Sequence, residues 1–155
     1  CYNSVVAGWP IGLILDSEKG NTQKAATDGL LLLHRIVFAG TDLTGSDFNK
    51  VYKDELYDYK TKTTDPSKKS FSSTFFLLPA NGNKVVDQWV ARSWQGIQSI
   101  IAASTSVGGA LQGSFAELQS NNWFDKSATF VGAFRDASDD WTAGWANFDP
   151  ENTIY

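Results

Sequence analysis

The feature that most constrains the fold is a pair of short apolar segments that recur along the chain. Val6-Ala7-Gly8 is matched further along by Phe38-Ala39-Gly40, and a third, less similar copy lies at 129–134. Glycine or proline residues lie at the ends of these short β-prone runs, because both residue types destabilise the interior of a central strand. Short strands that recur between corner residues are typical of a chain whose successive turns stack, so that each turn buries its inward side chains against its neighbours.

The chain divides into three parts of different character. Residues 1–40 carry the first two copies of the apolar segment and predict coils of stacked strands. Residues 41–120 predict a mostly helical insertion or cap, because the apolar residues of 47–59 and of 84–105 follow helical spacing. Residues 121–155 predict a final coil and an aromatic C-terminal cap.

Composition excludes several classes of protein. Lysine and arginine number 13 against 17 aspartates and glutamates, and the net charge of −4 does not suit a protein that neutralises nucleic-acid phosphates. Unbroken apolar runs reach only four residues. A membrane-spanning helix needs roughly 20, so no transmembrane segment is predicted. One cysteine and one histidine argue against an internal disulfide framework and a structural zinc site.

The last part of the chain is rich in aromatic and acidic residues. Eight aromatic and six acidic side chains lie in 122–155, against two basic ones. Because an uncovered strand edge promotes aggregation, we expect this segment to cover the open end of the stacked strands. The residues expected to be buried in this cap are Trp141, Trp145, Phe148 and Pro150.

The same segment carries a resemblance to a known family. Phe130-Val131-Gly132-Ala133-Phe134 and residues 140–155 resemble the end of a family of surface or secreted proteins of Bacteroidota, which finish in a VGAF…DWTxGWxxFDPxNTxY signature. Residues 3–10 resemble a late coil of the same family. The match is specific over this terminal stretch and less specific over 1–40, and it does not extend over 41–120.

The resemblance implies a right-handed parallel β-helix at the cell surface. The expected fold class is therefore mainly β with a helical insertion, in which the chain forms the last coils and the C-terminal cap of such a β-helix. Residues 135–139 depart from the shorter, glycine-containing link expected of the family, so the family does not predict this loop. The family has no defining catalytic residues, and the resemblance implies no activity.

The chain contains no methionine and begins with Cys1, which leaves two interpretations of that residue. It is either the lipidated first residue of a bacterial lipoprotein or an internal cysteine at the start of a truncated chain. A lipidated cysteine normally leads into a polar tether, whereas β-prone residues follow Cys1. We therefore expect the C-terminal part of a longer protein, with lipidation of Cys1 as the alternative.

Residue types that carry catalysis or bind metals are sparse. His34 is the single imidazole, it follows four leucines, and we expect it to be structural. The chain has no Gly-x-Ser-x-Gly motif, so no catalytic residue is predicted. Asp136, Asp139 and Asp140 are candidate ligands for calcium, which prefers six to eight oxygen atoms, and no other cofactor is predicted.

Tryptophan is the residue type most suited to a binding role here. Six tryptophans and five tyrosines offer flat surfaces on which sugar rings stack. Trp89 lies on a predicted helix, and Trp141 and Trp145 lie in the terminal signature, so these three are expected to pack inside the protein. The remaining candidate carbohydrate-binding residues are Trp9, Trp94 and Trp123.

Together these observations predict a non-catalytic β-helix protein with a structural, adhesive or assembly role. Its expected location is extracellular or the outer-membrane surface, and its expected partners are other surface proteins or extracellular glycan. Two alternatives stay open. One is a surface protein that binds or degrades polysaccharide, and the other is a lipoprotein subunit of an outer-membrane complex.

Overall fold

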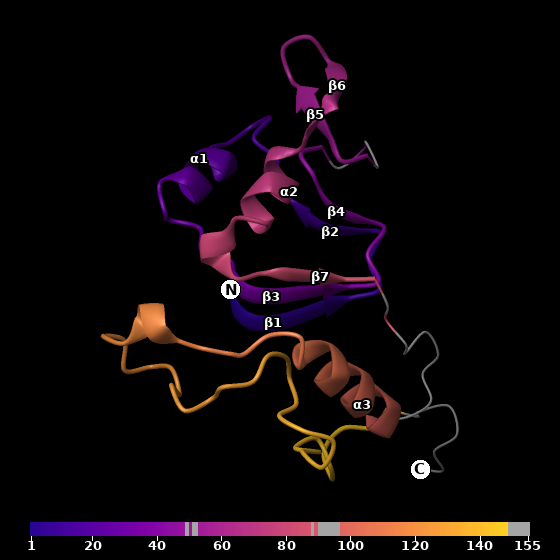
Figure 1. Ribbon diagram of the computed structural model, residues 1–155, viewed down its shortest axis with the longest axis vertical. Helices are drawn as coiled ribbons and strands as arrows, with labels where there is room; N and C mark the ends of the chain where they lie inside the picture. The colour runs from indigo at the N-terminus through magenta and orange to yellow at the C-terminus, as the bar shows by residue number, and fades with distance from the viewer. Residues whose placement is uncertain (49, 51–52, 88, 90–96, 149–155) are drawn as a thin grey trace.

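The computed structural model describes residues 1–48, 50, 53–87, 89 and 97–148. Within these residues, short strands form small separate sheets, both parallel and antiparallel, and helices pack around them (Figure 1). The strands are β1 (Tyr2–Ala7), β2 (Ile11–Ile14), β3 (His34–Ala39), β4 (Leu43–Ser46), β5 (Glu55–Asp58), β6 (Thr63–Lys69) and β7 (Lys84–Val86). The helices are α1 (Thr22–Thr27), α2 (Phe71–Phe76) and α3 (Ile97–Gly108), with 3₁₀-helices η1 (Pro79–Asn81) and η2 (Ala116–Leu118).

The two recurring apolar segments lie side by side in one parallel sheet. That sheet has the order β1-β3-β7, and Val6 of β1 pairs with Phe38 of β3. The strands β2 and β4 form a second parallel pair, with the same spacing along the chain as β1 and β3. Gly8 and Gly40 follow β1 and β3 with φ angles of 73° and 58°, which glycine adopts without strain.

Side chains alternate across β3, the central strand of the first sheet. Val37 packs on one face of the sheet, against Val107 of α3. Phe38 lies on the other face and stacks on Phe76 of α2, with the ring centroids 3.9 Å apart. Residues 36–39 are all buried. This continuous apolar run is what a parallel strand needs when both faces of its sheet are covered.

Buried polar groups hold α2 against the second sheet. The carboxylate of Asp47 accepts hydrogen bonds from the backbone N–H groups of Phe71 and Ser72, at 2.7 and 2.8 Å. The Ser70 hydroxyl accepts a bond from the N–H of Ser73 and caps the helix. A helix of six residues is too short to be stable alone, so these bonds and the buried phenylalanines fix its position.

The strands β5 and β6 form an antiparallel hairpin that projects from one end of the molecule (Figure 1). Near the outer end of the hairpin the rings of Phe48 and Tyr57 stack with centroids 4.4 Å apart, and Tyr59, which follows β5, meets both edge-on. The Tyr59 hydroxyl donates to Asp16 at 2.7 Å. The helix predicted over 47–59 is therefore wrong, because residues 55–58 form β5 and the rings of Phe48 and Tyr59 meet edge-on.

The predicted right-handed parallel β-helix is also wrong. The structure is a small mixed α/β protein whose strands form separate sheets, and the hairpin is antiparallel. A helix, α1, lies between β2 and β3. The third apolar copy, 129–134, forms no strand, and its Gly132 has a φ of 104°, which a strand does not use.

The long helix predicted over 84–105 is only partly present. Residues 84–86 form β7, which pairs with β3 and completes the first sheet. The helix α3 begins at Ile97 and continues to Gly108, and the residues at 88 and 90–96 lie outside the described part of the chain. The described residues of 41–120 are thus a mixture of strand and helix. No helix among the described residues is both long enough and apolar enough to cross a membrane.

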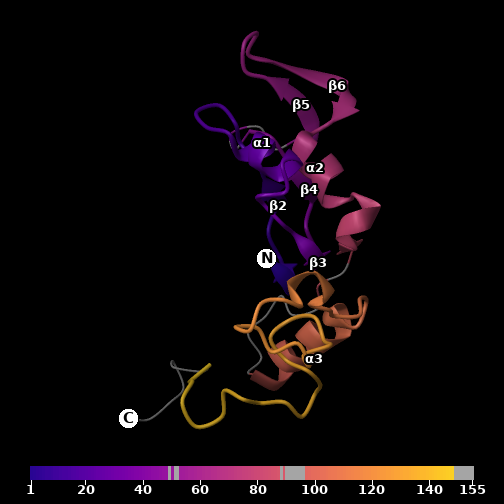
Figure 2. The same ribbon diagram turned by 90° about the vertical axis from the view of Figure 1, so that its left-hand side faces the viewer.

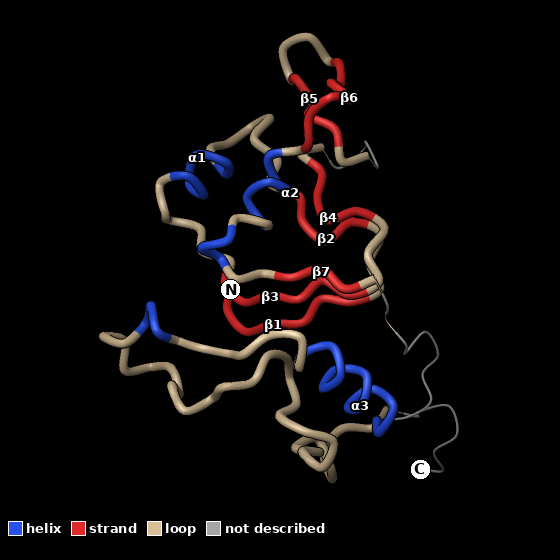
Figure 3. The backbone as a smooth tube through the Cα atoms, in the orientation of Figure 1, coloured by secondary structure: helices blue, strands red, loops and turns tan. Residues whose placement is uncertain are grey.

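After α3 the described chain is loop apart from η2 (Figure 3). Val131 and Phe134 are buried, with Val131 packed against the face of the first sheet. Beyond them the loop lies on the far side of α3 from the sheets (Figure 2). The predicted burial of Trp141 and Trp145 in a cap is wrong, since both are largely exposed. Phe148 is half-buried, and Pro150 lies outside the described residues.

Candidate functional site

Three aromatic rings form a ladder that leads from the protein interior to its surface. Phe134 is 6% exposed, Trp141 is 52% exposed and Trp145 is 69% exposed. The centroids of Phe134 and Trp141 lie 6.0 Å apart, and those of Trp141 and Trp145 lie 5.5 Å apart. The planes of each pair meet at 32° and 33°. We call these three residues the aromatic ladder.

Hydrogen bonds fix the orientation of both indole rings in the ladder. The Nε1–H of Trp141 donates to the carbonyl of Ala133 at 2.9 Å, and that of Trp145 donates to the carbonyl of Trp141 at 3.0 Å. The backbone between them turns tightly, because the N–H groups of both Trp145 and Ala146 bond to the carbonyl of Thr142. The polar group of each indole is therefore used inside the loop, while about half of Trp141 and more than half of Trp145 are exposed to solvent.

The carboxylates next to the ladder bind within their own loop. The carboxylate of Asp136 accepts bonds from the N–H and hydroxyl of Ser138 and lies 3.1 Å from Nε of Arg135. The hydroxyl bond is the main cause that lowers the pKa of Asp136 to about 2. Asp139 accepts from the N–H of Arg135, and Asp140 accepts from a threonine hydroxyl. These bonds give each of the three aspartates a structural role.

The structure does not bring the predicted calcium ligands together as a metal site. Within the described ranges, no group of three or more histidine, cysteine, aspartate or glutamate side chains is placed to hold a metal ion. Asp136, Asp139 and Asp140 instead close successive turns of one loop. Calcium binding at these residues stays a prediction that solution measurements have to test.

The single histidine lies in a polar cluster formed by Tyr2, His34, Arg35 and Glu117, which we call the His34 cluster. Both terminal nitrogens of Arg35 donate to the carboxylate of Glu117, at 2.8 and 2.6 Å. The ring of His34 stacks on that of Tyr2, with centroids 5.3 Å apart and planes 11° from parallel. Nδ1 of His34 lies 3.5 Å from Oε1 of Glu117.

The groups of the His34 cluster each keep one charge state near neutral pH. The hydrogen bonds from Arg35 lower the pKa of Glu117 to about 2, so its carboxylate is ionised and already bound. Burial lowers the pKa of His34 and raises that of Tyr2. At neutral pH the imidazole is therefore uncharged and the phenol keeps its proton. The stacking of His34 on Tyr2 supports a structural role for the ring, although Nδ1 of His34 and the hydroxyl of Tyr2 are buried without a hydrogen-bond partner among the described residues.

The cluster also supports two strained backbone positions. Asn3 and Arg35 have φ angles of 49° and 54°, in the left-handed region that residues other than glycine rarely adopt. They lie at equivalent places in β1 and β3. The side-chain oxygen of Asn3 accepts from Nε of Arg35 at 3.2 Å and from the N–H of Ser114 at 3.0 Å. These bonds tie both strained positions to the loop after α3.

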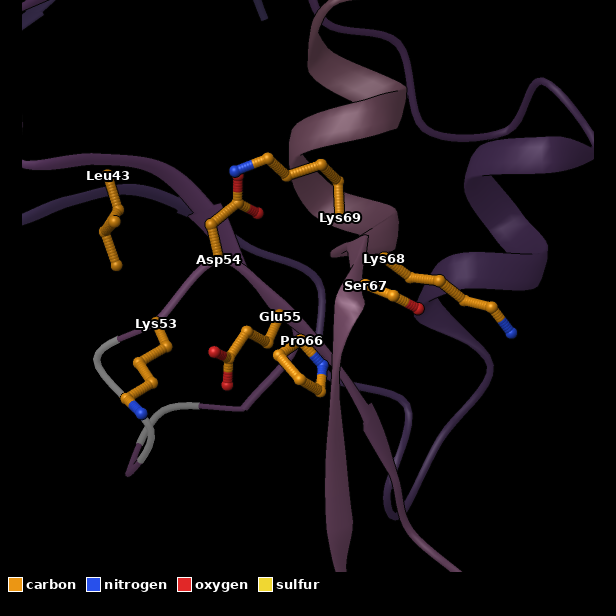
Figure 4. Close-up of a pocket in the computed structure, with 8 residues that line it drawn as sticks. All are labelled: Leu43, Lys53, Asp54, Glu55, Pro66, Ser67, Lys68 and Lys69. Atoms are coloured by element: carbon orange, nitrogen blue, oxygen red, sulfur yellow. The ribbon is translucent and has the colours of Figure 1, made fainter.

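A shallow groove of about 430 Å³ lies at the base of the β5–β6 hairpin (Figure 4). It is lined by residues 53–55 and 66–69 together with Leu43. The ammonium of Lys69 lies by the Asp54 carboxylate, at 3.4 Å, while the side chain of Lys68 points away from it (Figure 4). Lys68 instead pairs with Asp65, so the charges that line this side of the groove are largely neutralised by their neighbours.

The residues predicted to bind carbohydrate are dispersed rather than gathered in one site. Trp9, in the turn between β1 and β2, is 65% exposed, and Trp123, in the loop after η2, is 88% exposed. Trp94 lies outside the described residues. Cys1, the predicted lipidation residue, is exposed and its Sγ lies 3.3 Å from the hydroxyl of Ser4. Binding at Trp9 and Trp123 and lipidation of Cys1 stay predictions.

The ladder was not predicted as a candidate site, because the sequence pattern placed Trp141 and Trp145 in the interior. A signal for their exposure was nevertheless present. Both tryptophans are flanked by small or polar residues, and Asp139 and Asp140 directly precede the first of them. No role was predicted for Glu117 either, since its partner Arg35 lies 82 residues earlier in the chain.

Comparisons with protein-family models, with curated proteins and with solved structures found no match to this chain.

Proposed function

We propose that this protein is a non-catalytic adhesive protein that acts outside the cell or at its surface. The observation that supports this function is the aromatic ladder, in which hydrogen bonds hold the indoles of Trp141 and Trp145 while both side chains stay largely exposed. Exposed tryptophans contribute strongly to recognition when they are rigid, because little conformational entropy is lost on binding. Two further tryptophans, Trp9 and Trp123, are exposed elsewhere on the surface.

The polar groups of the molecule favour a non-catalytic role. The one imidazole of the chain is stacked and half-buried, and Glu117 beside it is bound by Arg35. The buried carboxylate of Asp47 is used to hold the start of α2. A general base needs a pKa near the working pH, and the pKa of Glu117, at about 2, is far below it.

An adhesion measurement tests the proposal. Beads that carry the whole chain are passed over cell layers and over immobilised extracellular polysaccharide and surface protein, and their retention under flow is counted. We expect more retention than for albumin-coated beads, and a clear decrease for a Trp141→Ala/Trp145→Ala variant. Retention equal to that of albumin would contradict the adhesive role. Release of new reducing ends from the polysaccharide would contradict the non-catalytic one.

A further inference from the structure

We propose that the aromatic ladder is a binding platform for a neutral polysaccharide, one of whose sugar rings stacks on the outer face of Trp145 while the neighbouring sugar contacts the exposed part of Trp141. This inference rests on the proposed adhesive function and specifies its ligand. It places the site at two residues whose sequence pattern predicted burial. Three properties of the ladder support it: the state of the indole N–H groups, the distance between the rings and the charge of the loop.

The indole N–H groups favour a ligand that binds through its C–H groups. Both N–H donors are already bound to backbone carbonyls, at 2.9 and 3.0 Å. What each tryptophan offers to a ligand is therefore its ring face and edge. The faces of a pyranose ring carry C–H groups that complement the negative face of an aromatic ring, whereas a ligand that needs a hydrogen-bond donor on the protein finds no free indole N–H.

The distance between the rings rules out an aromatic cage between them, which is how proteins commonly bind a quaternary ammonium group. Such a cation is bound inside a cage whose aromatic faces surround it. Here the centroids of Trp141 and Trp145 lie 5.5 Å apart and their planes are tilted by only 33°, so the rings contact each other. No space is left between them for a cation. The outer face of Trp145 is a flat surface that suits a flat ligand.

The charge of the loop selects against acidic polysaccharides. The residues from Phe134 to Phe148 include one arginine and three aspartates, and Arg135 is already paired with Asp136. A polymer of uronic acids or sulfated sugars would place like charges next to these carboxylates. Since like charges brought together at an interface cost binding energy, the platform favours an uncharged chain.

Affinity electrophoresis provides the test. The whole chain is run in native gels that contain galactomannan, xyloglucan or mixed-linkage β-glucan, and in a gel that contains polygalacturonate. We expect at least one neutral polysaccharide to retard the protein and polygalacturonate to leave its mobility unchanged. Trp145→Ala should raise the dissociation constant about tenfold, the order of effect of one aromatic contact. Trp145→Tyr, which keeps a ring, should retain most of the affinity.

Trp123→Ala is the matched control, because it removes a highly exposed tryptophan outside the ladder. It should leave retardation unchanged, and all variants should keep the far-UV circular dichroism and melting temperature of the parent. Loss of binding in Trp123→Ala but not in Trp145→Ala would overturn the assignment, as would preference for polygalacturonate. If no neutral polysaccharide binds while coated beads still adhere, the ligand is wrong and the adhesive function stands.

Discussion

The guanidinium of Arg35 in β3 and the carboxylate of Glu117 in η2 form a two-pronged ion pair, with both contacts at 2.8 Å or less. The two residues lie 82 positions apart in the chain. Through this pair the loop that follows α3 is bound to the central strand of the first sheet. Arg35 extends the contact further, since its Nε donates to the carbonyl of Ser114 at 3.0 Å.

Removal of the Glu117 carboxylate should loosen this connection. Glu117 is more than a third exposed, so solvent screens the pair, and we expect Glu117→Gln to lower the free energy of unfolding by about 1–2 kcal/mol. Urea unfolding followed by tryptophan fluorescence measures the effect. A double-mutant cycle with Arg35→Gln isolates the pairwise part. A coupling free energy near zero would show that the pair does not stabilise the fold.

The stability of the protein should decrease as the pH falls below about 6.5. Burial lowers the pKa of His34 from its ordinary value of 6.5, so the folded protein binds this proton less readily than the unfolded chain does. Protonation therefore favours unfolding, and the stability is fully present only above pH 6.5. Melting temperatures between about pH 7.5 and 5.5 test this, and His34→Gln should flatten the profile. An equally steep profile in the variant would assign the effect to another group.

A second loss of stability is expected at lower pH from Glu117. Its pKa is about 2 in the folded protein and 4.5 as an ordinary value, so its contribution is present above pH 4.5 and is lost as the pH falls towards 2. Glu117→Gln should remove that part of the acid transition. If the acid transition of the variant coincides with that of the parent, the Arg35–Glu117 pair is not its cause.

The ladder predicts a large loss of stability on truncation at its buried end and a small loss at its exposed end. Phe134 is 6% exposed, and Phe134→Ala should cost about 3–5 kcal/mol, as truncation of buried phenylalanines does. Trp145 is 69% exposed, and Trp145→Ala should cost less than about 1 kcal/mol. Thermal and urea unfolding of both variants provide the comparison. Equal losses would mean that Trp145 is buried in solution.

Gly108, at the end of α3, tests the contact between this helix and the terminal loop. A Cβ atom at Gly108 would lie 2.0 Å from the carbonyl oxygen of Val131, so the backbone would have to move. We expect Gly108→Ala to cost at least ~2 kcal/mol, an overpacking penalty. The neighbouring Gly109→Ala, whose nearest atom would be 3.2 Å away, should cost much less. Similar unfolding midpoints for the two variants would argue against this contact.

The sequence predicted the local β structure of residues 1–40 better than the overall architecture. The recurrence of Val6-Ala7-Gly8 as Phe38-Ala39-Gly40 was visible because both segments end at the same kind of corner, and the two lie paired in the first sheet. The prediction of a β-helix from these two paired segments was wrong. A local apolar pattern does not determine whether further strands continue the same stack. The third copy carries a similar apolar pattern but forms a loop.

The candidate site was harder to predict for a physical reason. Periodic spacing reports which side chains share a face, and it does not report what covers that face. Phe48 and Tyr59 have helical spacing, but their rings meet edge-on beside the β5–β6 hairpin instead of lying on one helix. Trp141 and Trp145 lie in a segment rich in aromatic residues, which is typical of a protein core. Their exposure is instead determined by the turn that the residues between them form. The ion pair of Arg35 with Glu117 depends on distant segments meeting.

The β5–β6 hairpin accounts for an irregularity in chain length between the parallel strands. Val37 pairs with both Val5 and Lys84, and the chain from Val37 to Lys84 is longer than the chain from Val5 to Val37. The excess equals the length of the hairpin from Glu55 to Lys69, whose two ends are paired neighbours. The hairpin is thus an insertion in the connection between β3 and β7, which would otherwise have the same length as the connection between β1 and β3. Its outer turn is the natural place to graft a foreign peptide or a fluorescent label without disturbing the register of the main sheet.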